Sequence, residues 1–367
     1  MEPVLSAVAD DGQELTFTLA GVDPSVANAL RRVILSEIPA LVFRTAPYEA
    51  NKCQILENTS RLNNEIIKQR LSCIPIHISD LDIPWDKYEL ELKKTNDQRV
   101  PIVVTTQDFR IKDTSTGNYI GEADSKKIFP PNAMTQDYID FLRLRPRILE
   151  GGGGESIHLT CKFDIGIAKD DGSFVQASTC AYGNTPDLER AATAWAEKEA
   201  ALKQGGMDAD KILLEKKDWA LLDGKRIYKE NSFDFRVESV GVYENSDLVK
   251  QGCMIMIDKI SKFEKALAVD GVKVEPSNTT VEHSFDVTLE DEDYTFGKVI
   301  ESILYEKFYT TGALTYCGFK KFHPHDPFSI IRLAFPSADP GSNPASQHLA
   351  LACQQAKSTY ESILGLF

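Results

Sequence analysis

A strand, a loop and an amphipathic helix follow one another twice in this chain, once near each end. The first copy of this cassette covers residues 15–43, and the second covers residues 281–319. A unit this small cannot bury its apolar face alone, so two copies predict two half-cores that need each other. This repetition limits the possible folds more than any other feature of the sequence.

In the first copy, residues 15–19 alternate between apolar and polar types, which predicts a half-buried strand. Asp23 is suited to cap a helix that has Pro24 at its first position. The apolar residues of this helix fall on a single stripe, which comprises Val26, Ala27, Leu30, Val33 and Ile34. Arg31 and Arg32 lie outside the stripe and are therefore expected on the polar side of the helix.

In the second copy, apolar residues alternate at 285–289 and predict a strand, and an acidic loop follows at 290–293. The next residues predict a helix that leads to a strand at Leu314. Its apolar positions are Phe296, Val299, Ile300, Ile303 and Leu304. The acidic loop lacks the alternating spacing of a calcium-binding loop, so we interpret it as a turn that caps the helix rather than as a cation site.

Each cassette is followed by a long helix with a heptad seam. In the helix that begins after residues 245–247, the apolar positions are spaced 4, 3, 4, 3, 4, namely Val249, Cys253, Met256, Ile260, Phe263 and Leu267. The C-terminal helix repeats this spacing at Leu349, Cys353, Ala356, Tyr360, Ile363 and Phe367. The spacing predicts helices that pack lengthwise on other helices. Two helices that pack separately on their own sheets are the alternative.

Between residues 47 and 162 the pattern changes to short strands and loops with one helix at 64–71, which predicts an inserted subdomain. The glycines at 151–154 predict a turn before the next strand. A phosphate-binding loop is the alternative, although no Gly-Lys-Ser/Thr follows. The charge-rich stretch 187–222 is predicted to be helical with a break at 205–206, and either to form a solvated face or to pack against a partner.

The composition narrows the class of protein. A length of 367 residues predicts roughly two or three domains, and 42% hydrophobic residues suffice for real cores. The 41 basic and 55 acidic residues give a net charge of −14, which argues against a free-standing nucleic-acid binder because phosphate binding needs a basic surface.

The cysteines and the apolar runs bear on the compartment. Seven cysteines without paired spacing are typical of a reducing compartment, so we expect a protein of the nucleus or the cytoplasm. The acidic start of the chain indicates no signal peptide, and no apolar run approaches the roughly 20 residues of a membrane helix. The sequence therefore predicts a soluble protein.

A family resemblance begins at residues 27–39, which read Ala-Asn-Ala-Leu-Arg-Arg-Val-Ile-Leu-Ser-Glu-Ile-Pro. This segment resembles the N-terminal helix of the alpha-type assembly subunits of cellular multi-subunit RNA polymerases: bacterial alpha, archaeal D and the third-largest subunit of eukaryotic polymerase II. Further stretches similar to the eukaryotic and archaeal versions are 58–76, 166–169 and 235–241. Residues 290–298 and 318–324 resemble the small partner subunit, archaeal L or the eleventh subunit of polymerase II. The segments occur in family order.

The chain also departs from this family. Many relatives hold a zinc loop or an iron–sulfur cluster in the inserted subdomain, but Cys53, Cys73, Cys161 and Cys180 are far apart in the sequence without a C-x-x-C pair. We therefore expect no metal and no cofactor. Where the family has a His, a basic residue and a Trp, residues 170–174 read Asp-Asp-Gly-Ser-Phe, which puts the contacts of that loop in doubt.

The fusion of two subunits in one chain is the largest departure, because most relatives encode them separately. Fused forms resemble those of some large DNA viruses. A viral source would also allow packaging of the protein in a virion.

The resemblance implies an α+β fold in which two alpha-type dimerisation cores pair within one chain. It implies a large dimerisation domain at 1–48 and 165–270, a mainly β inserted subdomain at 49–164, and a small dimerisation domain at 271–367. The residues expected at the pseudo-dimer interface are Leu30, Val33, Ile34, Val249, Met256, Ile260, Phe263, Phe296, Val299, Ile300, Ile303, Ala356, Tyr360 and Ile363. A domain-swapped dimer of two chains is the alternative.

The implied function is a non-catalytic assembly platform of a DNA-directed RNA polymerase. Its implied partners are the two largest catalytic subunits and small polymerase subunits, with DNA and RNA contacted only indirectly and no membrane involved. The residues carried over to the interface with the second-largest subunit are Asn28, Arg31, Arg32, Glu65, Arg70 and Lys169. Guanidinium groups suit bidentate pairing with carboxylates, but a solvated arginine pair is the alternative. For Glu65 and Arg70 the alternative is local stabilisation of their helix.

Two other classes of function remain open from the residues alone. His323, His325 and Asp326 are candidate ligands of a metal-dependent hydrolase. However, Pro324 and Pro327 indicate a turn, and no second cluster supplies the remaining ligands. A stand-alone scaffold or regulator that shares the assembly fold is the other alternative.

Overall fold

The computed structural model describes residues 2–147, 153–337 and 344–367. The chain separates into two compact units. The larger unit comprises Met1–Val33, Thr179–Glu238 and Val249–Phe367, and the smaller unit comprises Ile34–Ser178 and Ser239–Leu248. The turn predicted at 151–154 falls partly outside the described residues, at 151–152.

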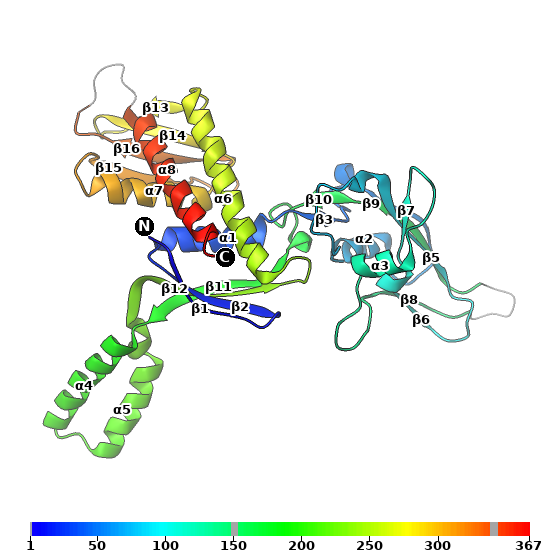
Figure 1. The fold of residues 1–367 in the computed structure, drawn as a ribbon, viewed down its shortest axis with the longest axis horizontal. Coiled ribbons are helices and arrows are strands. Elements are labelled where there is room, and N and C mark those ends of the chain that lie inside the picture. Colours follow the sequence, from blue (N-terminus) through cyan, green and yellow to red (C-terminus); the bar gives the residue numbers. More distant parts are fainter. Residues whose placement is uncertain (1, 148–152, 338–343) are drawn as a thin grey trace. The chain divides into compact units, whose positions relative to one another are not determined.

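The larger unit contains a four-stranded sheet, the N-terminal sheet, with the strand order β1-β2-β12-β11 (Figure 1). Its strands are β1 (Val4–Asp10), β2 (Glu14–Ala20), β11 (Ala177–Pro186) and β12 (Tyr228–Ser239). The alternation predicted at 15–19 is confirmed, because Leu15, Phe17 and Leu19 are buried on one face of β2. Phe17 lies opposite Phe235 in the antiparallel pairing, and the two rings stack with centroids 5.0 Å apart.

A second four-stranded sheet in the larger unit, the C-terminal sheet, is antiparallel and has the order β13-β14-β16-β15. Its strands are β13 (Val274–Pro276), β14 (Ser284–Glu290), β15 (Tyr316–Lys320) and β16 (Phe328–Ala334). The strand predicted from the alternation at 285–289 is confirmed as β14. The strand expected at Leu314 begins at Tyr316, because a π-helical turn at Tyr305–Tyr309 prolongs the preceding helix and the Leu314 N–H bonds to the Phe308 carbonyl.

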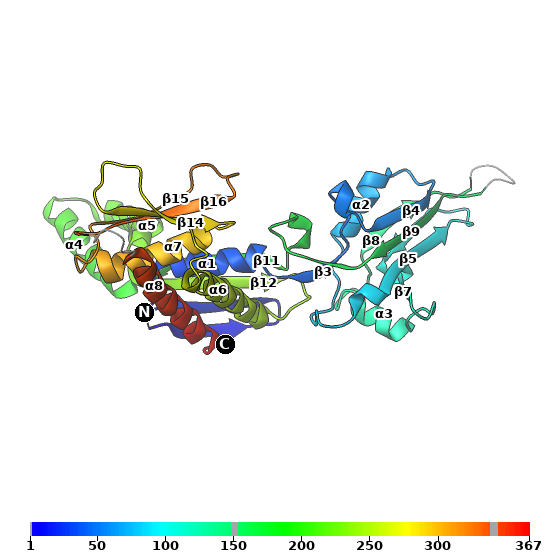
Figure 2. The same ribbon diagram turned by 90° about the horizontal axis from the view of Figure 1, so that it is seen from above.

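Four helices lie between these two sheets in both ribbon views (Figures 1 and 2). They are α1 (Pro24–Ser36), α6 (Asn245–Ala268), α7 (Tyr294–Leu304) and α8 (Pro344–Leu364). All four were predicted from apolar periodicity. We call β1, β2, α1, β11, β12 and α6 the N-terminal half of the larger unit, and β13 to α8 its C-terminal half.

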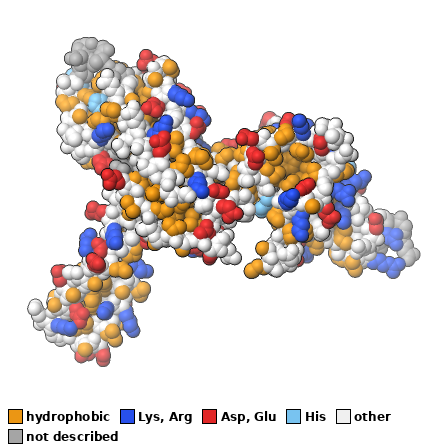
Figure 3. Space-filling view, viewed as in Figure 1, with side chains coloured by type: hydrophobic (Ala, Val, Ile, Leu, Met, Phe, Trp, Pro, Cys, Tyr) orange, Lys and Arg blue, Asp and Glu red, His pale blue; other side chains and the backbone are white. Residues whose placement is uncertain are grey.

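A helical hairpin is inserted between β11 and β12. It consists of α4 (Leu188–Gln204) and α5 (Ala209–Leu221), which confirms the predicted break at 205–206. Trp195 and Trp219 hold the helices together with ring centroids 5.5 Å apart. On the face shown in Figure 3, the hairpin presents hydrophobic side chains among charged ones of both signs. This surface has no single dominant charge.

The smaller unit is rich in short strands. Its sheets have the orders β4-β9-β5-β7, β6-β8 and β10-β3. The strands are β3 (Ala40–Val42), β4 (Cys53–Asn58), β5 (Tyr88–Thr95), β6 (Ile102–Thr105), β7 (Arg110–Asp113), β8 (Asp140–Leu144), β9 (Ser156–Lys162) and β10 (Asp164–Gly166). The helices are α2 (Asn64–Ser72), which was predicted, and α3 (Glu122–Ile128).

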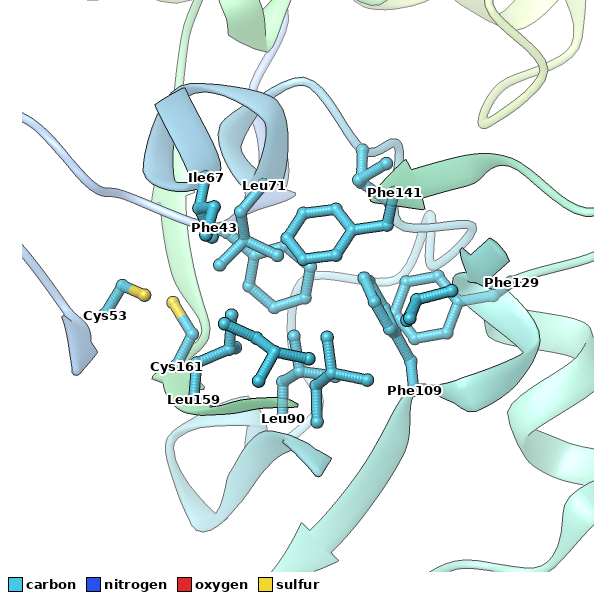
Figure 4. Close-up of a cluster of buried hydrophobic side chains, with 14 of the residues drawn as sticks. Phe43, Cys53, Ile67, Leu71, Leu90, Phe109, Phe129, Phe141, Leu159 and Cys161 are labelled. Carbon is cyan, nitrogen blue, oxygen red and sulfur yellow. The ribbon is translucent and has the colours of Figure 1, made fainter. Parts of the chain in front are cut away.

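The core of the smaller unit is aliphatic and contains a group of phenylalanine rings (Figure 4). The Phe109 ring meets those of Phe129 and Phe141 edge-on, with centroids 5.3 and 5.4 Å apart. Ile67 and Leu71 of α2 are fully buried in the same cluster. This unit therefore has a hydrophobic core of its own.

No helix among the described residues is both long and apolar enough to cross a bilayer.

Candidate functional site

The candidate site is the contact between the two halves of the larger unit, which we call the joint. Almost every residue expected at the pseudo-dimer interface is buried, with exposed fractions of 2% or less. These are Leu30, Val33, Val249, Met256, Ile260, Phe296, Val299, Ile300, Ile303, Ala356, Tyr360 and Ile363. Phe263 is only half-buried, and Ile34, although buried, belongs to the smaller unit.

Aromatic side chains make contacts that span the joint. The Tyr360 hydroxyl on α8 donates to the Val26 carbonyl on α1 over 3.4 Å. The rings of Phe263 and Phe296 meet at 71° with centroids 5.2 Å apart, which joins α6 to α7. Phe367 meets Phe17 edge-on at 4.9 Å. Each half therefore supplies part of the other half's core.

The titratable groups in the joint behave as apolar groups. Burial raises the pKa of the Cys253 thiol to about 12. Burial, with the Glu264 charge, does the same for the pKa of Cys353. The pKa of the Tyr360 hydroxyl lies well above its ordinary value, mainly because the side chain is fully buried. At neutral pH these groups stay protonated, so they supply no nucleophile.

A set of charged residues, the clamp, also crosses the joint. The Arg32 Nη2 atom on α1 lies 2.9 Å from Asp293 Oδ2, and its Nε donates to Thr295 Oγ1 over 2.8 Å. Asp293 caps α7 at the same time, because its Oδ1 accepts the Thr295 N–H at 2.7 Å. The Lys259 Nζ atom on α6 lies 3.2 Å from Glu292 Oε2. The clamp thus consists of Arg32, Lys259, Glu292 and Asp293.

The clamp gives the acidic loop 290–293 a role that the sequence did not reveal. The turn that caps α7 is confirmed, but two of its carboxylates also pair with cations of the N-terminal half. Arg32, which was expected to face a partner subunit, is occupied within the chain. The sequence does contain the charged residues, since an arginine pair occurs in one cassette and an acidic run in the other. Which of them pair with each other could be seen only in the folded structure.

Arg31 and Asn28 lie one helical turn apart on α1 and form a local pair. The Nε and Nη2 atoms of Arg31 donate to Asn28 Oδ1 over 3.1 and 3.0 Å. Both residues are half-buried. The bond holds the guanidinium along the helix, which fixes its direction without neutralising its charge.

The other expected interface residues lie in the smaller unit. Arg70 donates to the carbonyls of Phe141 and Asp140 over 2.6 and 2.7 Å, which ties α2 to β8. Glu65 is exposed in the first turn of α2. Lys169 is exposed, and its N–H donates to the Ser36 carbonyl over 2.7 Å. Arg70 thus stabilises the local packing of α2 on β8.

The histidine turn has a structural arrangement of its own. The His323 N–H donates to Asp326 Oδ2 over 2.9 Å, and the His325 N–H donates to His323 Nδ1 over 3.2 Å. The ring nitrogen nearest to the turn is therefore already engaged. Within residues 2–147, 153–337 and 344–367, no three His, Cys, Asp or Glu side chains form a group that could hold a metal ion.

Two cysteines that are distant in the sequence do meet. Cys53 and Cys161 lie opposite each other in the β4–β9 pairing, and both are buried (Figure 4). A hydrogen bond between the thiols, stronger in effect than burial, lowers the pKa of Cys53 and raises that of Cys161. Cys73 is exposed, so the strands bring together two thiols rather than a four-cysteine set.

Comparison with known proteins assigns the fold. Residues 16–260 match the model of the RNA polymerase Rpb3/Rpb11 dimerisation domain, which is more than half of the chain. The chain belongs to this family. The match begins in β2 of the N-terminal half and ends in α6, and the mixed helix and strand structure agrees with the predicted α+β class.

Similar proteins in the Rpb3/Rpb11 family come from eukaryotes and archaea. The chain is 26% identical to DNA-directed RNA polymerases I and III subunit rpac1 of Dictyostelium discoideum over 202 residues, which are 50% of this chain and 52% of the relative. Human RPAC1 is 27% identical over 198 residues, 48% and 53% of the two chains. Subunit Rpo3 of Pyrococcus furiosus is 24% identical over 266 residues, 68% and 91% of the two. The chain spans about half the length of these rpac1 and RPAC1 relatives.

Proposed function

We propose that this member of the Rpb3/Rpb11 family is a non-catalytic assembly subunit of a DNA-directed RNA polymerase. Its relatives are named as subunits of such polymerases. The joint carries the proposal, because it is an extensive apolar interface between two sheet-and-helix halves whose buried thiols stay protonated. Catalysis then lies on other subunits of the complex.

We further propose that the two halves form a pseudo-heterodimer within one chain. The family match ends at residue 260, and the C-terminal half beyond it has its own four-stranded sheet and its own pair of helices. The 1–48 and 165–270 segments are the proposed large dimerisation domain, 49–164 the inserted subdomain and 271–367 the small one. Pairing within one chain raises the local concentration of the partner to about millimolar. Exchange of halves between two chains is the alternative, and it would double the mass in solution.

Docking of the second-largest polymerase subunit is proposed for the polar side of α1 and for the smaller unit. On α1 we favour Arg31 with Asn28, because Arg32 contributes to the clamp. Glu65, Arg70 and Lys169 complete the proposed contact. The proposed partners are the two largest subunits and small polymerase subunits, and contact with DNA or RNA is indirect. The complex would act in the nucleus or the cytoplasm, and packaging in a virion would follow from a viral source.

Affinity purification of the tagged chain, followed by mass spectrometry, tests the assembly role. We expect two very large polypeptides to co-purify in amounts comparable with the tagged chain. Recovery of the chain without them would contradict the proposal and favour a stand-alone scaffold or regulator. Activity that depends on an added metal ion would instead favour the hydrolase built on the histidine turn.

The docking residues are tested by Arg31→Ala combined with Arg32→Ala. We expect the chain to remain folded and to recover less of the second-largest subunit. Arg190→Ala combined with Arg226→Ala removes two exposed arginines elsewhere in the larger unit and serves as the matched control. Equal co-purification from the two double variants would refute the α1 contact.

A further inference from the structure

A groove in the smaller unit gathers three arginines, although the chain as a whole has a net charge of −14. Its volume is about 600 Å³, and its walls come from the loop before α2, from α2 and from β8. The lining residues are Arg61, Leu62, Arg70, Asp140, Phe141, Leu142 and Arg143. Three cations face one carboxylate, so the lining of the groove has a positive net charge, opposite in sign to that of the whole chain.

The contacts of the three arginines neutralise little of their positive charge. Arg70 donates to two backbone carbonyls, which fix its guanidinium but carry no net charge. Arg143 lies 4.0 Å from the Asp140 carboxylate, and both side chains are mostly exposed, so this pair is weak. Among the described residues, Arg61 has no hydrogen-bond or ion-pair partner. The groove therefore offers cationic donors that a ligand can still use.

Apolar side chains lie beside these cations. Phe141 and Leu142 are buried at the base of the groove. Ile66 lies four residues before Arg70, hence on the same face of α2, and is 41% exposed. Ile139, which directly precedes β8, is exposed to the same extent. Arginine is enriched at the energetic centres of protein interfaces, and the exposed aliphatic groups beside it would be buried when a partner binds.

The chemistry favours an acidic protein segment over a nucleic acid. Single-stranded nucleic acids need exposed aromatic faces on which bases stack, whereas Phe141 points into the core (Figure 4). Carboxylates of a protein segment pair bidentately with guanidinium groups, and its aliphatic side chains would cover the exposed Ile66 and Ile139. We propose that this groove binds a segment of another polymerase subunit in which acidic and aliphatic residues alternate, an inference that rests on the proposed assembly function.

A charge-reversed groove tests the proposal directly. The variant is Arg61→Glu with Arg143→Glu, and Arg70 is kept because it ties α2 to β8. Arg190→Glu with Arg226→Glu makes the same change in net charge on the larger unit and is the control. The probe is a short fluorescein-labelled peptide of alternating glutamate and leucine, followed by fluorescence anisotropy on the full chain. We expect binding at least about tenfold weaker in the groove variant and nearly unchanged in the control.

Three outcomes of the peptide measurement would overturn the proposal. They are no binding of the peptide to the natural chain, equal binding to both variants, and equal binding of a peptide with glutamine in place of glutamate. Preferred binding of a single-stranded oligonucleotide at the groove would also overturn it, in favour of a nucleic-acid ligand. The peptide measurement uses the isolated chain. A natural chain that binds the peptide through the groove but co-purifies with no large subunit would therefore refute the assembly function alone.

Discussion

Helices α1 and α7 stand at equivalent points of the two cassettes, yet they are buried differently. Helix α1 buries one stripe and keeps a polar side on which Asn28, Arg31 and Arg32 are half-buried. Helix α7 packs more closely on its own sheet, and at Gly297 an added Cβ would lie 2.0 Å from the Phe319 ring. The two helices, although they come from the same sequence pattern, therefore have different roles. The first keeps a surface with oriented polar groups, whereas the second is committed to the joint and to its own sheet.

This contrast predicts that stability depends most on contacts that cross the joint and least on features confined to one half. Four changes to the chain test this prediction. All four can be followed by urea denaturation with circular dichroism, and by differential labelling of the buried thiols in the two units.

The largest effect is expected from Tyr360→Ala. Tyr360 is fully buried on α8 and reaches the Val26 carbonyl on α1, so its truncation opens a cavity in the joint. We expect a loss of about 3–5 kcal/mol in the free energy of unfolding. Tyr360→Phe removes only the hydroxyl and should cost about 1 kcal/mol. Similar losses for the two variants would show that packing across the joint matters less than this one hydrogen bond.

A smaller loss of stability is expected when the clamp is broken. The contribution of its Arg32–Asp293 pair is measured by a double-mutant cycle of Arg32→Met and Asp293→Asn. Asparagine keeps the cap of α7 while it removes the charge, so the cycle isolates the ion pair. The side chains are 40% and 28% exposed, and we expect a coupling energy of about 0.5–1 kcal/mol. Additive effects of the two substitutions would mean that the clamp adds no stability to the joint.

A pH-dependent effect is expected from Asp286, which pairs with Arg332 inside the C-terminal sheet. The Arg332 guanidinium donates to both carboxylate oxygens over 2.6 and 2.7 Å and lowers the pKa of Asp286. A lowered pKa adds stability above the unfolded value of about 3.9, and this stability is lost as the pH falls through the folded value. The stability advantage over Asp286→Asn should therefore be constant near neutral pH and shrink below about pH 4.

Comparison with Asp258→Asn, which changes an exposed carboxylate on α6, controls for the general effect of charge. An advantage of the natural chain over Asp286→Asn that persists at low pH would indicate that shape, not ionisation, favours the aspartate.

The smallest effect is expected when a short glycine-serine turn replaces the hairpin residues 188–221. The base of the hairpin is closed by the Asp187 N–H, which donates to the Ile227 carbonyl over 3.1 Å. Because Trp195 and Trp219 pack on each other, removal of the whole hairpin leaves no cavity in the joint. We expect a change of less than about 1 kcal/mol. A larger loss would show that the N-terminal half depends on the hairpin.

The sequence predicted the elements whose burial is one-sided. The period-2 pattern of β2 and the heptad seams of α6 and α8 each record one buried face, and these elements are confirmed. The last predicted seam position, Phe367, lies beyond α8, because that helix ends at Leu364. Strand β1 was missed because it is exposed on both faces and so has no alternation to detect. Strand β13 was not predicted, since its three residues acquire their conformation by pairing with β14.

The candidate site was only partly predictable for a related reason. Apolar residues of the joint follow a local period, so they could be named from sequence. The Arg32–Asp293 pair joins residues 261 positions apart, and no local pattern specifies which carboxylate meets which guanidinium. Similarly, Cys53 and Cys161 lack metal-ligand spacing in the sequence and meet only through strand register.

The break in the hairpin has a practical consequence for handling the protein. Phe367 packs against Phe17, so a peptide tag attached directly after Phe367 would lie beside the joint. Gly205 and Gly206 sit at the tip of the hairpin instead, and Gly206 has a φ of +74° with open space around it. A peptide epitope inserted there would leave every sheet register intact. The proposed complex could then be recovered through this internal tag.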